Sequence, residues 1–322
     1  MHTQWKRREF LAVSAAAGAS LMTRGRLEAA PLKTHLKKAL IGKPTIETLE
    51  SWKAAGFDGI ESNDRAVSLD AAAETRKKAE KMGMRVHSML YGWANFNSKD
   101  AGKVASDIEG VAHALRATEA YGGTALLLVP CRIGGMAMPQ PWDFEIEFDP
   151  KTGHVEKVVP GDNVPYAAYI EAQNHATDAS RRAIRKLIPV AEKAGVVIAV
   201  ENVWNNLWVK PDIFKNFVAS FDSPWVQAYF DIGNHVKYAM PEEWIRTLGK
   251  LIAKVHVKDF KVDRKAGRGG KFVNIREGDV DWPLVRQELD KIGYNGWMTI
   301  EGSGGLPLDE KSKRLDLIIA GK

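Results

Sequence analysis

Cysteine is nearly absent from this sequence. Cys131 is the only one among 322 residues, so no disulfide can form within the chain. Stability must therefore come from a packed core, and a chain of this length with 45% hydrophobic residues can bury a large one. No Gly-x-Gly-x-x-Gly motif follows an apolar run, which removes the main signature of a dinucleotide-binding fold.

An excess of one sign of charge is also missing. Lys and Arg number 46 against 40 Asp and Glu, a net charge of +6, and residues 1–30 hold five of the basic and two of the acidic residues. The remainder therefore carries 41 basic and 38 acidic residues, a net charge of only +3. Basic residues are interspersed with acidic ones except in the loop at 265–271, so we expect no nucleic-acid partner.

The first thirty residues resemble an export signal. Residues 6–11 read KRREFL, with Arg7 and Arg8 as the pair, and an Ala-rich apolar segment at 12–22 is too short for a transmembrane helix. We therefore expect a twin-arginine signal peptide over 1–30, the twin-arginine export machinery as a partner, and a periplasmic or secreted protein. Retention at the membrane by an uncleaved signal is one alternative, and a short amphipathic helix on the fold's rim is another.

From about residue 36, short apolar runs alternate with longer helical patterns. The predicted strands cover residues 36–41, 59–61, 85–90, 125–129, 196–201, 226–231, 254–258 and 297–301. The predicted helices cover 46–55, 69–82, 106–121, 166–194, 211–220, 241–248, 282–292 and 309–319. The strand runs are almost continuously apolar, as in parallel strands buried on both faces. The pattern predicts a single-domain (β/α)₈ TIM barrel over 31–322. Long loops at 130–165 and 261–279 follow predicted strands, so we expect both to cover the pocket.

Four ionisable residues lie at or near the carboxyl ends of the last four predicted strands: Glu201, Asp231, His256 and Glu301. Parallel strands of a barrel converge at one mouth, and bare carboxylates gathered there would repel one another. A divalent cation resolves that conflict, and one nitrogen with three carboxylates suits Mn²⁺ best, with Mg²⁺, Co²⁺, Zn²⁺ or Fe²⁺ as alternatives. Taken singly, Asp231 could instead cap a helix and His256 could be a core histidine.

Further residues near strand ends are candidates for binding the substrate. Each also has a structural alternative, namely wall packing, an ion pair or the ordering of a loop. They are Glu61 at the second strand, His87 at the end of the third, Arg132 after the fourth, and Trp204, His235 and Lys258 after the fifth, sixth and seventh.

The same strand ends carry motifs of a known family. They read GFDGIE at 56–61, VEN at 200–202, FDIGN at 230–234, VHVKD at 255–259, REGDVDW at 276–282 and IE at 300–301. With them the chain resembles the xylose isomerase-like TIM-barrel superfamily, specifically its sugar isomerase and epimerase branch, over roughly residues 36–320. The resemblance implies that Glu201, Asp231, His256 and Glu301 bind the metal and that the two glutamates are the acid/base pair. Several epimerases of the branch have Asp-x-x-His, whereas here His235 lies four residues after Asp231.

These observations predict a metal-dependent sugar isomerase or epimerase that removes a proton next to a carbonyl and passes through an enediolate. Because phosphorylated sugars are mainly cytoplasmic, the export signal favours a small unphosphorylated keto-sugar. A lyase, hydratase or dehydratase of a keto-sugar or 3-keto-glycoside begins with the same step and is the alternative. A non-catalytic carbohydrate-binding barrel is a third interpretation. The sequence leaves the sugar and the oligomeric state open, and a homo-oligomer built on the outer helices is compatible with it.

Overall fold

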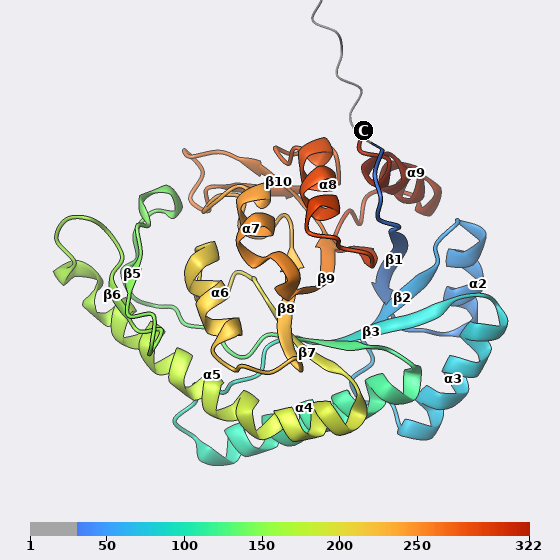
Figure 1. The fold of residues 1–322 in the computed structure, drawn as a ribbon, viewed down its shortest axis with the longest axis horizontal. Coiled ribbons are helices and arrows are strands. Elements are labelled where there is room, and N and C mark those ends of the chain that lie inside the picture. The colour runs from blue at the N-terminus through green and yellow to red at the C-terminus, as the bar shows by residue number, and fades with distance from the viewer. Residues whose placement is uncertain (1–30) are drawn as a thin grey trace, which may run out of the picture. The chain divides into compact units, whose positions relative to one another are not determined.

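The structure is a computed structural model that describes residues 31–322, and the predicted signal at 1–30 lies outside the described residues. Residues 34–322 form one compact unit, a closed barrel of eight parallel strands with helices around it (Figure 1). The strands follow the order β1-β12-β9-β8-β7-β4-β3-β2 around the barrel. They are β1 (Lys37–Gly42), β2 (Gly59–Ser62), β3 (Arg85–Tyr91), β4 (Ala125–Leu128), β7 (Val197–Glu201), β8 (Val226–Asp231), β9 (Ile252–Val257) and β12 (Trp297–Ile300). The prediction of a closed (β/α)₈ barrel is confirmed.

Helices connect successive strands and cover the outside of the barrel (Figure 1). They are α2 (Ile46–Ala54), α3 (Leu69–Lys81), α4 (Ala101–Tyr121), α5 (Ala167–Ala194), α6 (Pro211–Ala219), α7 (Pro241–Leu248) with the 3₁₀ turn η4 (Gly249–Leu251), α8 (Trp282–Lys291) and α9 (Leu308–Ile319). α4 begins before the predicted residue 106 because Asp100 caps it and accepts hydrogen bonds from two backbone amides. It ends at Tyr121, and the next residue, Gly122, caps it with a φ of 78°, a left-handed conformation that glycine adopts without strain. Within the described chain, no helix is long and apolar enough to cross a membrane.

The inside of the barrel is only partly apolar. One small group of buried apolar side chains consists of Ala125, Leu127, Val129, Ala199 and Tyr229. Several buried polar side chains from other barrel strands contact one another, namely Glu61, His87, Ser88, His256 and Thr299. Branched apolar residues usually fill a barrel of this kind. In this barrel, part of the interior is instead filled by polar side chains that contact one another.

The two long loops have secondary structure of their own. The first holds the 3₁₀ helices η2 (Pro141–Asp143) and η3 (Val164–Tyr166) and the hairpin strands β5 (Glu147–Phe148) and β6 (Val155–Lys157). The second lies within a hairpin of β10 (Asp259–Val262) and β11 (Gly270–Val273) and the turns that follow it. The loops meet where the guanidinium of Arg264 lies 5.5 Å from the centre of the Trp142 ring. Both follow barrel strands, so they lie on the rim at the carboxyl ends.

Candidate metal centre

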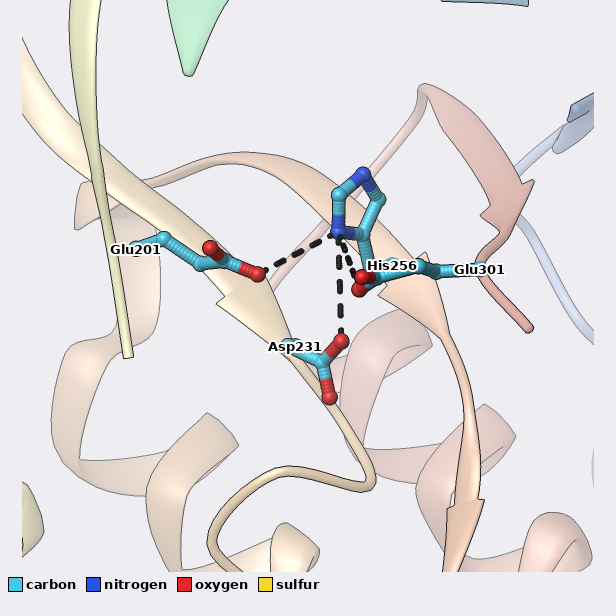
Figure 2. A group of neighbouring side chains, drawn as sticks. All are labelled: Glu201, Asp231, His256 and Glu301. Atoms are coloured by element: carbon cyan, nitrogen blue, oxygen red, sulfur yellow. Dashed lines mark ion pairs between the residues drawn. The ribbon is translucent and has the colours of Figure 1, made fainter. Parts of the chain in front are cut away.

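Four side chains converge at the carboxyl ends of β7, β8, β9 and β12 (Figure 2). Nδ1 of His256 lies 3.5 Å from Glu201 Oε1, 3.8 Å from Asp231 Oδ2 and 3.2 Å from Glu301 Oε2. One donor atom from each residue lies within 4.8 Å of all the others. The structure thus brings together the four residues that the strand-end pattern singled out, around a space the size of a single ion.

The bonding of these atoms tests whether a cation fits. Nδ1 of His256, Oδ2 of Asp231 and Oε2 of Glu301 are all buried, and none has a hydrogen-bond partner in the described structure. Burying such atoms without partners is costly, and all three face the same point. One nitrogen and three carboxylate oxygens are donors that a divalent transition metal or Mg²⁺ accepts, so the residues fit the group.

The Asp231 carboxylate is held from behind by backbone amides. Its Oδ1 accepts hydrogen bonds from the amides of Gly233 at 2.9 Å and Asn234 at 2.6 Å, which leaves Oδ2 directed at the other ligands. Asn202 bridges the ends of β7 and β8, since its amide side chain bonds both the N–H and the C=O of Asp231. A side chain at residue 233 would lie 2.7 Å from the Lys258 carbonyl, so this turn requires glycine.

The His256 ring is oriented by a second carboxylate. Its Nε2 lies 2.6 Å from Oε2 of Glu61, which is completely buried, and Ser88 donates to the other Glu61 oxygen at 3.1 Å. A carboxylate on the far nitrogen fixes the tautomer that presents Nδ1 to a metal. Glu61 therefore lies inside the barrel against His256 and not on the rim, and a direct contact with substrate stays a prediction.

His87 lies deeper still, and its expected position at a strand end is wrong. β3 continues to Tyr91, and His87 lies in its middle as the extra residue of a bulge opposite Ile60 and Glu61. The ring hydrogen-bonds Ser88 Oγ at 2.9 Å and Thr299 Oγ1 at 3.0 Å, and it stacks on Trp297. Burial holds the pKa of His87 well below its usual range, so the ring is neutral.

Burial and charge set the protonation of the cluster without a cation. Burial raises the pKa of Asp231 to about 8 and also raises that of Glu201, and the neighbouring carboxylates add to both shifts. For His256, Lys258 and Glu301, burial acts in the opposite direction, but the nearby charges and hydrogen bonds shift the pKa further than burial does. The carboxylates raise the pKa of His256 well above its usual range and raise that of Lys258, and these two groups lower the pKa of Glu301. Protonated His256 and Lys258 thus supply the positive charge that a divalent ion would otherwise bring.

Lys258 lies beside the metal position. Its Nζ is 2.8 Å from Glu301 Oε2, 3.5 Å from Asp231 Oδ2 and 3.1 Å from the side-chain oxygen of Asn234. Asn234 also points its amide nitrogen at Glu201 Oε1, 3.4 Å away. Sequence reasoning assigned no role to Asn234, although it stands in the FDIGN motif, and the structure makes it the link between Lys258 and Glu201.

An aromatic and cationic rim surrounds the site. The rings of Trp204 and Phe272 are 4.8 Å apart, and Lys258 Nζ lies 4.8 Å from the Phe272 ring. Arg132 donates to the Trp204 carbonyl at 3.1 Å and stacks 4.1 Å over the exposed ring of Trp93. Phe272 comes from β11 and is 41% exposed. No strand-end pattern could identify it, because the β10–β11 hairpin alone carries it to Trp204.

His235 is not brought to this cluster. Its ring is buried between Tyr238 and Trp244, and Nε2 lies 3.0 Å from the Val203 carbonyl. Burial lowers the pKa of His235 to about 3, so the ring is neutral and donates this hydrogen bond. A role for His235 in binding substrate therefore has no support from its contacts and stays a prediction.

Known proteins share this fold and part of this sequence. A sequence model of the family described as Xylose isomerase-like TIM barrel matches residues 49–316. The L-ribulose-5-phosphate 3-epimerase UlaE of Escherichia coli O1:K1 / APEC is 26% identical over 287 residues, which cover 84% of this chain and 86% of that protein. A solved D-tagatose 3-epimerase-like protein has a TM-score of 0.64 at 17% identity and covers 88% of this chain and 98% of its own. The 3-keto-D-glucoside 4-epimerase YcjR from E. coli has a TM-score of 0.63 at 16% identity, with 88% and 98% covered.

Proposed function

The chain belongs to the xylose isomerase-like TIM-barrel family, and on that premise we propose that it is a metal-dependent sugar isomerase or epimerase. The proposed substrate is a small unphosphorylated keto-sugar. The observation that carries the proposal is the cluster of Glu201, Asp231, His256 and Glu301, whose ligand atoms lie within 4.8 Å of one another and three of which are buried without a hydrogen bond. Two of the proteins reported above are named as sugar epimerases and the third as similar to one, which agrees with this chemistry.

The reaction begins by removing a proton from a carbon next to a carbonyl. A divalent cation, when bound, supplies Lewis-acid stabilisation of the negative charge that develops on the enediolate. Glu201 and Glu301 reach the site from β7 and β12, which β8 and β9 separate, so they can flank a substrate lying between them. One carboxylate takes the proton from one face and the other returns it to the opposite face, which inverts the carbon. Such acid–base catalysis contributes roughly 10²–10⁴-fold.

Lys258 has a separate part in this scheme. Its ammonium lies between Asp231 and Glu301 and is fixed by Asn234, so it can donate a hydrogen bond to a substrate oxygen close to the proton-transfer group. Burial would raise the pKa of Glu301, and the positive charge of Lys258 works against it, which helps to keep this carboxylate ionised. An ionised Glu301 is ready to accept a proton.

One observation favours a second candidate, a lyase or hydratase acting on a 3-keto-glycoside. The rim is a chain of contacts from Phe272 through Trp204 and Arg132 to Trp93, so it offers more than one aromatic ring. Aromatic faces stack on sugar rings, so this rim could hold the second part of a glycoside. The similarity to the fold of a 3-keto-D-glucoside 4-epimerase is consistent with a substrate of that size.

Proton exchange in D₂O separates the two candidates. Protein loaded with Mg²⁺, which leaves NMR lines sharp, is incubated with a panel of unphosphorylated ketoses and 3-keto-glycosides, and carbon-bound protons are followed by NMR. Deuterium entering one carbon, together with a new sugar, is expected for an epimerase or isomerase. Glycoside cleavage or loss of water would assign the lyase. Tight sugar binding with no exchange at any carbon, both with Mg²⁺ and in a parallel incubation with Mn²⁺ that is removed by chelator before the spectrum, would overturn both enzymatic proposals.

The metal itself is proposed to be Mn²⁺. The nitrogen ligand favours it over Mg²⁺, which prefers oxygen ligands and retains water, while Co²⁺, Zn²⁺ and Fe²⁺ also accept this donor set. Titration of chelator-treated protein with each ion, followed by calorimetry and by recovered turnover, tests the choice. Recovery with Zn²⁺ but not with Mn²⁺ would refute it.

We also propose that the protein is exported by the twin-arginine route, on the evidence of the sequence at residues 6–22. Replacing Arg7 and Arg8 by Lys is expected to leave the protein in the cytoplasm when cells are fractionated. Replacing Arg24 and Arg26 in the same way provides the control and is expected to have no effect. Equal distribution of both variants between the fractions would reject the twin-arginine signal.

A further inference from the structure

The amino ends of several barrel strands line a cavity at the mouth opposite the metal centre. Its volume is about 580 Å³. The residues that line it include the first residues of three strands, Lys37 of β1, Val197 of β7 and Trp297 of β12, together with Gln227 of β8 and Lys254 of β9. We call this cavity, with these five residues, the N-terminal pocket.

Lys254 is the unusual member of the pocket. It is only 6% exposed, and within residues 31–322 its ammonium makes no ion pair and no hydrogen bond. It precedes His256 by two residues on the same strand, so both side chains point to the same face, the barrel interior. Its ammonium is poorly solvated because most of the side chain is buried, and the nearby charge of Glu61 offsets only part of that cost, so this position favours a ligand that brings negative charge into the pocket.

The nearest candidate for a partner within the protein is engaged elsewhere. Glu61 is the buried acid of the same interior, and its two carboxylate oxygens are taken by His256 at 2.6 Å and by Ser88 at 3.1 Å. No aspartate or glutamate is among the residues that line the N-terminal pocket. Within the described chain, the charge of Lys254 is therefore without an ion-pair partner.

The remaining lining residues add hydrogen-bond donors and no negative charge. Lys37 lies over the Trp297 ring, with its Nζ 5.3 Å from the ring centre, and it has no ion pair within the described residues. Gln227 and Thr124 offer an amide and a hydroxyl to the same space. Two ammonium groups, an amide and a hydroxyl around one cavity match the several oxygens of a phosphate group.

We propose that the N-terminal pocket is a binding site for a phosphate oxyanion, held by Lys254 and Lys37. The site is separate from the metal centre and does not depend on the proposed catalytic function. Inorganic phosphate and the phosphate of a small phosphomonoester present the same oxygens to the lysines. In the second case, the open side of the pocket would accommodate the organic part.

The test is a titration of metal-free protein with inorganic phosphate at constant ionic strength, read by calorimetry and by thermal unfolding. Saturable binding and a rise in Tm are expected for wild type, while the same concentration of chloride gives neither. Lys254→Met is expected to weaken phosphate binding about tenfold to a hundredfold, the loss of one charge-assisted hydrogen bond. Lys250→Met, which removes an exposed lysine from the turn before β9, is the matched control and is expected to bind like wild type.

One further variant and one further ligand make the test more specific. Lys254→Arg keeps the charge and is expected to retain binding, which shows that a loss in Lys254→Met is due to charge and not to a damaged fold. Ribose 5-phosphate distinguishes the sources, because tighter binding than inorganic phosphate identifies a phosphomonoester, and equal binding identifies the free anion. Phosphate binding that is absent in wild type, or that is unchanged in Lys254→Met, would overturn the proposal.

Discussion

The two mouths of this barrel have opposite electrostatic character. At the carboxyl ends, three carboxylates crowd around His256 and leave buried acceptor atoms that a cation would satisfy. At the amino ends, Lys254 and Lys37 line a pocket without an acid. The same strand contributes to both, since Lys254 precedes His256 on β9 by two residues, about 6.6 Å along a strand. Lys254 and His256 are close in sequence, but β9 runs from one mouth of the barrel to the other and so places them in two different sites.

The largest effect is expected on turnover, from a substitution in the carboxyl-end site. Glu301→Gln keeps the shape of the side chain but removes a ligand charge and a proton acceptor, so turnover is expected to fall by about 10²–10⁴-fold. Steady-state kinetics of the metal-loaded protein measure it. Glu310→Gln, on the exposed helix α9, is the control and is expected to be nearly neutral. Unchanged turnover in Glu301→Gln would mean that Glu301 does not transfer the proton.

The next effect concerns the amino-end site. Burial lowers the pKa of Lys254 from 10.5 to about 8, so between these pH values the unfolded chain binds more protons than the folded one. The cost of the buried charge is fully present below about pH 8 and disappears as the pH rises past 10.5. Lys254→Met is therefore expected to raise the unfolding free energy at pH 7 by up to about 3 kcal/mol, with the gain shrinking at alkaline pH.

Chemical denaturation in a phosphate-free buffer between pH 6 and about 10.5 measures that gain, and Lys250→Met serves as the comparison. A gain of the same size at every pH would point to the added apolar side chain and not to the removed charge. A loss of stability at pH 7 would show that Lys254 has a partner that stabilises it in the folded protein.

A smaller effect tests the support behind the carboxyl-end ligands. Glu61→Gln preserves the volume but weakens the hydrogen bond to His256 Nε2, so metal affinity is expected to fall about 10–100-fold. Calorimetric metal titration measures this directly, without reference to turnover. Ser88→Ala removes the contacts to the far oxygen of Glu61 and to the His87 ring, neither of which involves His256 directly, and is expected to have a weaker effect on metal affinity. Equal losses in the two variants would contradict a specific role for Glu61 in orienting His256.

The smallest expected effect is on the rim of the carboxyl-end mouth. Phe272→Ala removes a ring that contacts Trp204 and Lys258, and an aromatic contact of this kind is worth about 0.5–1.5 kcal/mol. KM is expected to rise by roughly twofold to tenfold with little change in kcat. Leu317→Ala, another exposed apolar residue but on α9, is the control. A fall in kcat at constant KM would place Phe272 in the chemical step instead of in binding.

Apolar periodicity was sufficient to predict the barrel. Parallel strands buried on both faces must be apolar along their length, so eight such runs alternating with helical patterns identify the fold without knowledge of any contact. The same regularity places the carboxyl ends of all strands at one mouth, and this is why Glu201, Asp231, His256 and Glu301 could be grouped from sequence. Their role as metal ligands stays a prediction, which the buried donor atoms without hydrogen bonds support.

The supporting contacts could not be predicted in this way. Glu61 reaches His256 across 195 residues of sequence, and the bulge in β3 decides that Ser88 and not His87 bonds it. A bulge inserts one residue and so reverses which side chains face inward beyond it, and no local pattern in β3 signals it. The position of Phe272 depends in the same way on the β10–β11 hairpin, which the sequence showed only as a long polar loop.

The sequence by itself determined the fold class, the mouth at which the candidate site lies and the kind of donor atoms gathered there, because these follow from periodicity and strand direction. Only the tertiary structure decided which carboxylate orients His256, that Asn234 joins Lys258 to Glu201, and that Lys254 is buried without a partner. The physical reason is the separation along the chain of the residues that set each property. Periodicity is a property of neighbouring residues, whereas pairing and burial of charges depend on the register between strands far apart in the chain.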